Sequence, residues 1–330
     1  MKTKLLALLL ATLLLASLFV ACKKDPQTAE DAPIRIYTLN GTTGFGMAKL
    51  MNDNTDGAKY EITVKTDASD VTAALISGDV DIAALPTNAA ANVYNKTSGG
   101  VKILAVNTLG CLYLLTKDGV TVSSFADLRG KTVYVPAQNP TFIFTDLCKK
   151  NGLTPGTDIT IDSTSYAQPA NLRDAVASGA VEIAVLPEPM VTVAMAKAKQ
   201  AGVTLKNALD LTVEWDKVNT PGSLVQGCVV VRTEYLEANP EKVAAFLADY
   251  KASIEFLNAN AAEAAAMIEA TGIFAQASVA EKAIPKCNVC YLDGAAMKSA
   301  MEVYLTALMN INAAAIGGKL PGADFYYNAE

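Results

Sequence analysis

The chain has 330 residues, of which 51% are hydrophobic and 18% charged, and none of them is histidine. The hydrophobic content supplies a core and argues against disorder. The lack of histidine excludes a Ser-His-Asp or Cys-His nucleophile, a histidine general base and zinc held by histidine. Removal of a leader with its two lysines leaves 25 basic against 33 acidic residues, a side-chain charge of −8 that disfavours nucleic-acid binding.

Residues 1–21 begin with two lysines and continue as an apolar run of 17 residues. This run is short for a membrane span of about 20 residues and ends in small residues, as cleaved signal peptides do. The sequence LFVAC (18–22) resembles a bacterial lipobox, although Phe19 stands where leucine is usual. The resemblance implies lipidation of Cys22 and a polar tether over 22–32, and an uncleaved N-terminal anchor is the alternative. Either way the remaining chain is expected outside the cytoplasm, anchored to the cell membrane.

Five cysteines remain after the leader, and an odd number cannot all pair. The spacing of Cys287 and Cys290 is that of a redox motif, but no thioredoxin-type βαβ pattern surrounds it. We therefore expect all five to be small buried residues rather than a disulfide framework.

An internal repeat indicates the architecture. The segments AALISGDVDIAALP (73–86) and AVASGAVEIAVLP (175–187) share eight identities over 13 positions at an offset of 101 residues. Each copy is typical of a helix end, a glycine stop, a buried strand and a proline just beyond it.

The similarity extends upstream of the repeat. Strands are predicted over 34–39 and 132–135, each followed by a polar loop and then a helix that begins at Phe45 or Phe142. Second strands are predicted over 60–66 and 158–165. Each half thus alternates strand and helix three times, which indicates parallel strands joined by right-handed crossovers.

We predict an α/β fold of two similar hinged lobes with open, mainly parallel sheets. Lobe 1 comprises 33–110 and 226–330, and lobe 2 comprises 111–225. The last part of lobe 1 is predicted to contain a strand over 226–231 and helices over 242–258, 261–270, 279–284 and 295–312. The two crossings, near 107–113 and 221–229, each contain a Gly-Cys pair, and two connecting strands predict hinged closure around a ligand.

The sequences LISGDVDIAALP (75–86), SSFADLRGKTVYVP (123–136), ASGAVEIAVLPEP (177–189) and QGCVVVRTEYLEANPEKVAAFLADY (226–250) occur in this order. They resemble the nitrate/taurine/alkanesulfonate group of substrate-binding proteins of ABC importers, which includes binders of thiamine pyrimidine precursors. The resemblance implies the type II periplasmic-binding-protein fold. It also implies a monomer that delivers a small solute to a membrane permease. The chain has no phosphate loop of the form GxxxxGK[ST], so the ATPase is expected to be a separate subunit.

Ligands of open α/β sheets lie beyond the carboxyl ends of the strands, near helix N-termini, and polar side chains at these positions are the candidate contacts. The same residues are also ordinary helix caps, and Trp215 is either a stacking platform or a packed aromatic. The candidate ligand-binding residues are Asn40, Thr42, Thr43, Thr87, Asn88, Gln138, Asn139, Thr141, Glu188, Trp215 and Gln226.

The class of ligand stays open between two alternatives. The loops 40–44, 86–90 and 137–142 contain no Lys or Arg, but hydroxyls and helix N–H groups could hold a sulfonate. Glu188 instead favours a ligand with amine donors, such as taurine or an aminopyrimidine. No cofactor, metal or catalytic residue is predicted. The alternative functions are a surface lipoprotein that senses solute without transport and a pyrimidine-synthase-like enzyme, whose chemistry would lack a histidine.

Overall fold

The computed structural model describes residues 32–54 and 56–327, and a single compact unit begins at Ile34. The expected leader and Cys22 lie outside the described residues. Among the helices over these residues, none combines the length and the apolar character that a membrane span requires.

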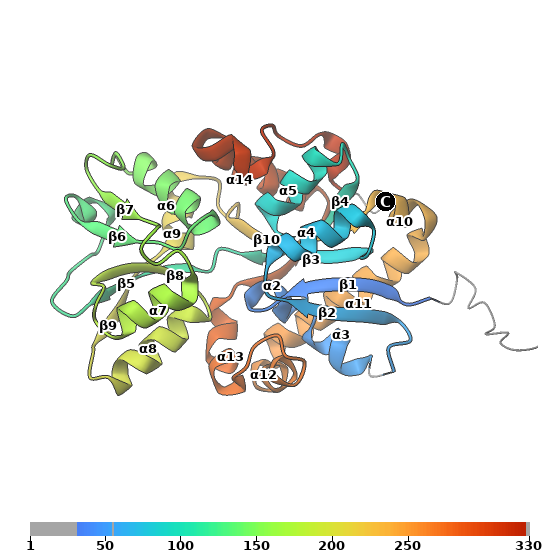
Figure 1. Cartoon of the computed structure of the whole chain (residues 1–330), viewed down its shortest axis with the longest axis horizontal. Helices are drawn as coiled ribbons and strands as arrows, with labels where there is room; N and C mark the ends of the chain where they lie inside the picture. The colour runs from blue at the N-terminus through green and yellow to red at the C-terminus, as the bar shows by residue number, and fades with distance from the viewer. Residues whose placement is uncertain (1–31, 55, 328–330) are drawn as a thin grey trace, which may run out of the picture. The chain divides into compact units, whose positions relative to one another are not determined.

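The first sheet has the strand order β11-β4-β10-β3-β1-β2, and we call it, with the helices packed on it, lobe 1. β1 lies between β2 and β3 and is parallel to both (Figure 1). β10 runs antiparallel to β3 and β4, and β11 runs antiparallel to β4. The strands are β1 (Ile34–Leu39), β2 (Tyr60–Lys65), β3 (Ile82–Pro86), β4 (Val101–Leu109), β10 (Val225–Arg232) and β11 (Val289–Leu292).

The second sheet has the order β7-β6-β8-β5-β9, and it defines lobe 2. β6 pairs in parallel with β7 and β8, and β5 runs antiparallel to β8 and β9. The strands are β5 (Leu112–Lys117), β6 (Thr132–Tyr134), β7 (Thr160–Asp162), β8 (Ile183–Pro187) and β9 (Leu205–Asp210).

Helices connect the strands of each lobe. The helices of lobe 1 are α2 (Thr42–Phe45), α3 (Ala48–Asp53), α4 (Ala68–Ser77), α5 (Thr87–Lys96), α10 (Thr233–Ala238), α11 (Pro240–Ala259), α12 (Ala261–Ala270), α13 (Ala277–Ala283) and α14 (Gly294–Asn312). Those of lobe 2 are α6 (Asn139–Lys150), α7 (Pro169–Ala177), α8 (Met190–Gln200) and α9 (Leu211–Val218).

The predicted fold class is confirmed, because β2-β1-β3-β10-β4 and β7-β6-β8-β5-β9 have the same order and the same parallel core. The repeated segments form the matching strands β3 and β8, which are apolar and buried on both faces as parallel strands require. Gly78 and Gly179, which precede them, have φ of 83° and 77° and end α4 and α7 in the left-handed conformation that glycine adopts readily.

The two crossings between the lobes are tightly packed at their glycines. A Cβ atom on Gly110 would lie 2.3 Å from the Thr212 hydroxyl oxygen, and one on Gly227 would lie 2.5 Å from Oδ1 of Asn107. Glycine, which has no Cβ atom, therefore allows the close approach of the chain at each crossing.

Some element boundaries differ from the prediction. The helix expected from Phe45 begins at Thr42 and is interrupted before α3, and the helix expected from Phe142 begins at Asn139, where Pro140 fits the first turn. The strand expected over 158–165 is only Thr160–Asp162, because the Asp162 carboxylate accepts hydrogen bonds from the backbone of the next residues and forms a turn.

The five cysteines that follow the leader are free thiols. Cys111, Cys148, Cys228 and Cys287 are buried, and Cys290 is partly buried. Burial raises the pKa of the Cys148 thiol to about 12, so that it is protonated at neutral pH.

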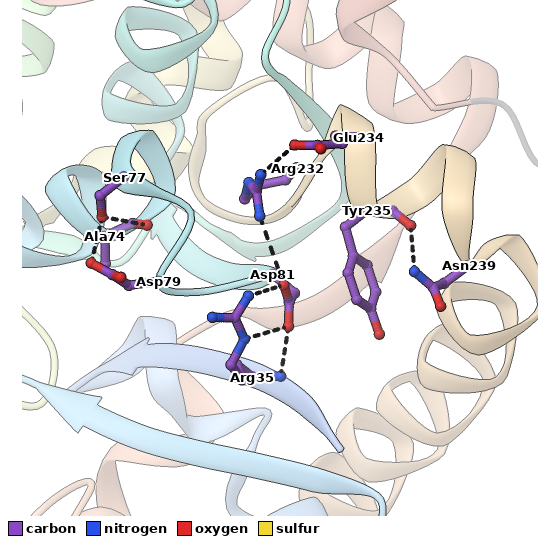
Figure 2. Close-up of polar contacts among 9 residues, drawn as sticks. All are labelled: Arg35, Ala74, Ser77, Asp79, Asp81, Arg232, Glu234, Tyr235 and Asn239. Atoms are coloured by element: carbon purple, nitrogen blue, oxygen red, sulfur yellow. Dashed lines mark hydrogen bonds and ion pairs between the residues drawn. The ribbon is translucent and has the colours of Figure 1, made fainter. Parts of the chain in front are cut away.

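A buried carboxylate joins three strands at the amino ends of β1 and β3, the sheet edge opposite the helix N-termini. Asp81 is only 3% exposed and accepts hydrogen bonds from the Arg35 backbone N–H (3.1 Å) and guanidinium (2.6 and 3.0 Å). Arg232, at the end of β10, lies 3.9 Å from the same carboxylate and pairs with Glu234 (Figure 2). This network is structural, because it satisfies a carboxylate that has lost its water.

Candidate functional site

A pocket of about 610 Å³ lies where the N-terminal ends of α4 and α5 approach those of α6 and α7. We call it the interlobe pocket, because α4 and α5 belong to lobe 1 and α6 and α7 to lobe 2. These helices follow β2, β3, β6 and β7, so the pocket lies at the carboxyl ends of parallel strands. Its polar lining residues are Asp67, Ser69, Thr72, Asn88, Asn92, Lys96, Gln138, Gln168 and Asn312.

The electrostatics of the interlobe pocket come mainly from these four helices. They are 9 to 12 residues long, and no side chain caps the N-terminus of any of them. Each N-terminus carries about half a positive charge on N–H groups that lack intrahelical partners. Lys96 adds a cationic side chain and Asp67 an opposing carboxylate. The backbone therefore supplies most of the attraction for an anion.

Two asparagines of α5 contribute oxygens without hydrogen bonds. Oδ1 of Asn88 and Oδ1 of Asn92 are buried and have no partner among the described residues. The residues are four apart, so they share one face of α5, and both line the interlobe pocket. Buried polar atoms without partners are rare in proteins, and because these two oxygens are acceptors they would be satisfied by water or by N–H or O–H donors of a ligand.

Gln138 and Asn139 occupy the start of α6. Gln138 is the N-cap, lines the pocket and has φ of 66°, a positive value that is uncommon outside glycine. Asn139 is the first helical residue, and its Oδ1 accepts a hydrogen bond of 2.6 Å from the Tyr304 hydroxyl. The structure thus brings Asn88 and Gln138 to the pocket and Asn139 next to it.

Thr42 and Glu188 meet across the two lobes. The Thr42 hydroxyl donates a buried hydrogen bond of 2.8 Å to the backbone oxygen of Glu188. A second link between the lobes joins the Tyr113 hydroxyl to the backbone oxygen of Lys286 at 3.0 Å. In this conformation the candidate residues Thr42 and Glu188 therefore join the two lobes.

The Glu188 side chain is hydrogen-bonded to the first turn of α8, which begins two residues later. It is 2% exposed, and its two oxygens accept hydrogen bonds from the Thr192 hydroxyl (3.0 Å) and backbone N–H (3.1 Å). Burial raises the pKa of the Glu188 carboxyl, while the Thr192 bonds and the charge of Lys286 oppose the shift. The carboxylate thus has the capping role that the sequence left open beside ligand contact.

Of three other candidates, the Gln226 side chain is bound within the protein, whereas Thr43 and Asn40 make their internal hydrogen bonds through the backbone. Oε1 of Gln226 accepts the Cys111 backbone N–H at 2.7 Å, and the backbone oxygen of Thr43 accepts from Asn107 at 3.2 Å. Asn40 is exposed, and its backbone N–H donates to Lys65.

Thr87, Thr141 and Trp215 also face inward. The hydroxyl of Thr87 donates to Val225 at 2.7 Å, and that of Thr141 donates to Pro136 at 2.7 Å. Trp215 has no exposed surface, and its Nε1 donates to Ser223 at 2.9 Å. Its ring therefore does not offer a stacking platform to an open space in this structure.

Sequence reasoning did not include the pocket residues that follow the second strand of each half. Ser69 and Thr72 come after β2, and Gln168 comes after β7. The signal was present in the sequence, because every strand-to-helix junction of a parallel sheet opens at the same edge. Among the described residues, no cluster of three or more cysteines and acidic side chains could hold a metal ion.

Comparison with known families identifies the class of protein. The sequence matches the family described as "ABC transporter, phosphonate, periplasmic substrate-binding protein" over residues 46–280. The match covers more than half of the chain, and the chain belongs to this family of substrate-binding proteins of ABC importers. The predicted relationship is confirmed, although phosphonate was not among the predicted ligands. A search of curated proteins found no match.

Solved structures agree with this assignment. An ABC transporter structure from Parabacteroides distasonis is 26% identical with a TM-score of 0.76, and the alignment covers 91% of this chain and 100% of that one. The aliphatic sulphonate binding protein SsuA of Escherichia coli is 16% identical (TM-score 0.71; 91% and 93% covered). The nitrate-binding protein NrtA of Synechocystis PCC 6803 is also 16% identical (TM-score 0.52; 73% and 66% covered), and the last two support the fold alone.

Proposed function

We propose that this protein captures a small organic solute with an anionic head group, of the sulfonate or phosphonate class, in the interlobe pocket. The observation that carries the proposal is the convergence of four helix N-termini without side-chain caps on one pocket. N–H groups and helix dipoles favour negative charge, and in a closed cleft uncharged donors are sufficient to hold an anion. These features favour an anionic head group, while the unpaired amide oxygens of Asn88 and Asn92 would accept hydrogen bonds from donors elsewhere on the solute.

The polar side chains of the pocket complete the proposed site. Asn88 and Gln138 present amide groups beside the helix N-termini, and Ser69 and Thr72 present hydroxyls. Among the described residues no arginine lines the pocket, so the charge of the solute would be balanced by dipoles and by Lys96. This favours a compact head group that fits between the helix ends.

We also propose that Cys22 is lipidated and that residues 22–32 tether the protein outside the cytoplasm. Closure of the lobes around the solute would create the form that a membrane permease receives, with a separate ATPase subunit driving transport. The protein would act as a monomer, since each chain contains both walls of the pocket.

The test is calorimetric titration of residues 23–330, refolded from denaturant to remove bound solute, with methylphosphonate, methanesulfonate, taurine, nitrate and an aminopyrimidine. We expect binding of an anion. A carboxylate added by Gln168→Glu at the N-terminus of α7 should weaken it about tenfold or more through repulsion. The matched control is Gln200→Glu, which adds the same charge at the far end of α8. Binding of the aminopyrimidine alone, or equal effects of both variants, would contradict the anionic assignment.

A further inference from the structure

The interlobe pocket is larger than an anionic head group needs. Its volume is about 610 Å³, whereas a water molecule takes about 30 Å³ in the liquid, so a compact anion such as methanesulfonate would fill only a small part of it. Pockets of about 300–1,000 Å³ in proteins hold ligands of the size of a drug molecule. The remaining volume indicates that the solute has a body in addition to its head.

One wall of the pocket continues along α4 from its N-terminus. Ala68, Thr72 and Ile76 are spaced four residues apart, so they share one face of α4, and all three line the pocket. With a rise of about 1.5 Å per residue, Ile76 lies about 12 Å along the helix from Ala68. The wall therefore begins beside the helix ends that attract the head group and reaches an apolar side chain beyond them.

The facing wall, on α6 of lobe 2, is also apolar beyond its first turn. Phe142 comes four residues after Gln138, and both line the pocket. The Phe142 side chain is half-buried, because part of it packs against the core. On α5, Ala89 and Val93 add apolar groups to the lining. Apolar side chains from both lobes thus border the volume that the head group leaves empty.

Ile76 stands out by its exposure. Among the described residues, the exposed large hydrophobic side chains are Ile76 (55%), Val213 (52%) and Leu320 (46%), and of these three only Ile76 lines the pocket. A single exposed apolar side chain is ordinary, but one that continues a pocket wall beside other apolar groups is typical of a ligand-binding surface. A solute body placed there would remove water from Ile76 and Phe142 together.

We propose that Ile76 of lobe 1 and Phe142 of lobe 2 form an apolar subsite that selects anions with an alkyl or aromatic body over anions that consist of little more than a head group. The inference rests on the proposed function and narrows its solute class. Because the two side chains come from different lobes, the body of the solute contacts both lobes, and a longer body should also slow its release.

The expected size follows from the apolar surface that binding buries. A methylene group that is fully removed from water favours binding about fourfold, and we expect about twofold per methylene here, because the exposed Ile76 can be covered only in part. Hexanesulfonate has five methylene groups more than methanesulfonate, so it should bind wild type about 30-fold more tightly. Ile76→Ser should lower this ratio about threefold or more and leave the affinity for methanesulfonate unchanged.

The experiment is titration calorimetry of residues 23–330 with methanesulfonate, butanesulfonate, hexanesulfonate and benzenesulfonate. The matched control is Val213→Ser, because Val213 on α9 is exposed to a similar extent and does not line the pocket. It should leave every affinity ratio unchanged. Phe142→Leu keeps an apolar side chain against the core and should weaken benzenesulfonate more than methanesulfonate, because the contact between two rings is lost.

A second readout locates the body of the solute. The δ1 methyl signal of Ile76, identified as the one lost in Ile76→Ser, should move further with benzenesulfonate than with methanesulfonate, because a nearby ring shifts it. The methyl signals of Val213 should not differ in this way. Equal shifts of the Ile76 signal, hexanesulfonate binding no tighter than methanesulfonate, or the same ratio in wild type and Ile76→Ser overturns the apolar subsite. Failure of the wild type to bind any of the four anions overturns the proposed function instead.

Discussion

Removal of the Thr42 hydroxyl tests whether the contact between the lobes controls binding. The change Thr42→Val keeps the shape of the side chain and deletes the 2.8 Å hydrogen bond to the backbone oxygen of Glu188. A buried hydrogen bond contributes about 0.5–1.5 kcal/mol net, and an acceptor left without a partner costs about 1–3 kcal/mol. Because the bond joins the two lobes, its loss should destabilise the conformation described here, which we take as the closed, solute-binding form, by about 1–2 kcal/mol.

A weakened closed form lowers affinity in proportion, so we expect solute binding to fall about 5- to 30-fold. Titration calorimetry measures this, and dissociation kinetics should show faster release. The matched control is Thr233→Val, which deletes a 2.6 Å bond to the backbone oxygen of Gly99 within lobe 1. It should lower the melting temperature without changing the affinity. Equal affinities for Thr42→Val and wild type would refute the reasoning.

Three further changes test the fold and its pH dependence. Burial raises the pKa of the Glu188 carboxyl from its ordinary value, so its contribution to stability is present at low pH and is lost as pH rises through the raised pKa. Urea midpoints should therefore show wild type losing stability relative to Glu188→Gln as pH rises. A difference between the two proteins that stays constant with pH would argue against this. Gly44→Ala places Cβ 2.0 Å from the backbone oxygen of Leu39, so we expect the free energy of unfolding to fall by about 3 kcal/mol or the protein to fail to fold. An unchanged melting temperature would be inconsistent with this packing. Asp81→Asn should lower the free energy of unfolding by about 2 kcal/mol in chemical denaturation, because the carboxylate holds the Arg35 guanidinium. Glu182→Gln, at the exposed counterpart of Asp81 in the repeat, should lower it little. Similar losses in the two variants would show that the Asp81 network has no special contribution.

The sequence repeat was sufficient to predict the fold. The apolar strands at 82–86 and 183–187, each preceded by a left-handed glycine, are local patterns that do not depend on distant residues. Asn88 and Gln138 were found for the same reason, since they follow strands directly and the carboxyl ends of parallel strands meet at one edge.

The polar partners of the site could not be predicted, because they come from distant segments or from competition within one helix. The carboxylate of Glu188 binds the N-terminal turn of α8, the helix that follows it, instead of remaining free for a ligand. Trp215 and Tyr304 pack together only after α9 and α14 are brought side by side. The sequence of neither helix alone indicates that contact, because the contact depends on where the other helix packs.

The central claim is that this protein binds a small anionic solute, and the most direct test is the melting temperature of the stripped protein, residues 23–330, with and without each member of the solute panel. A solute present at about 100 times its Kd stabilises the folded state by about 2.7 kcal/mol, which raises the melting temperature by several degrees. We expect such a rise with a phosphonate or sulfonate and none with the aminopyrimidine. The reverse pattern, or no rise with any anion, would contradict it.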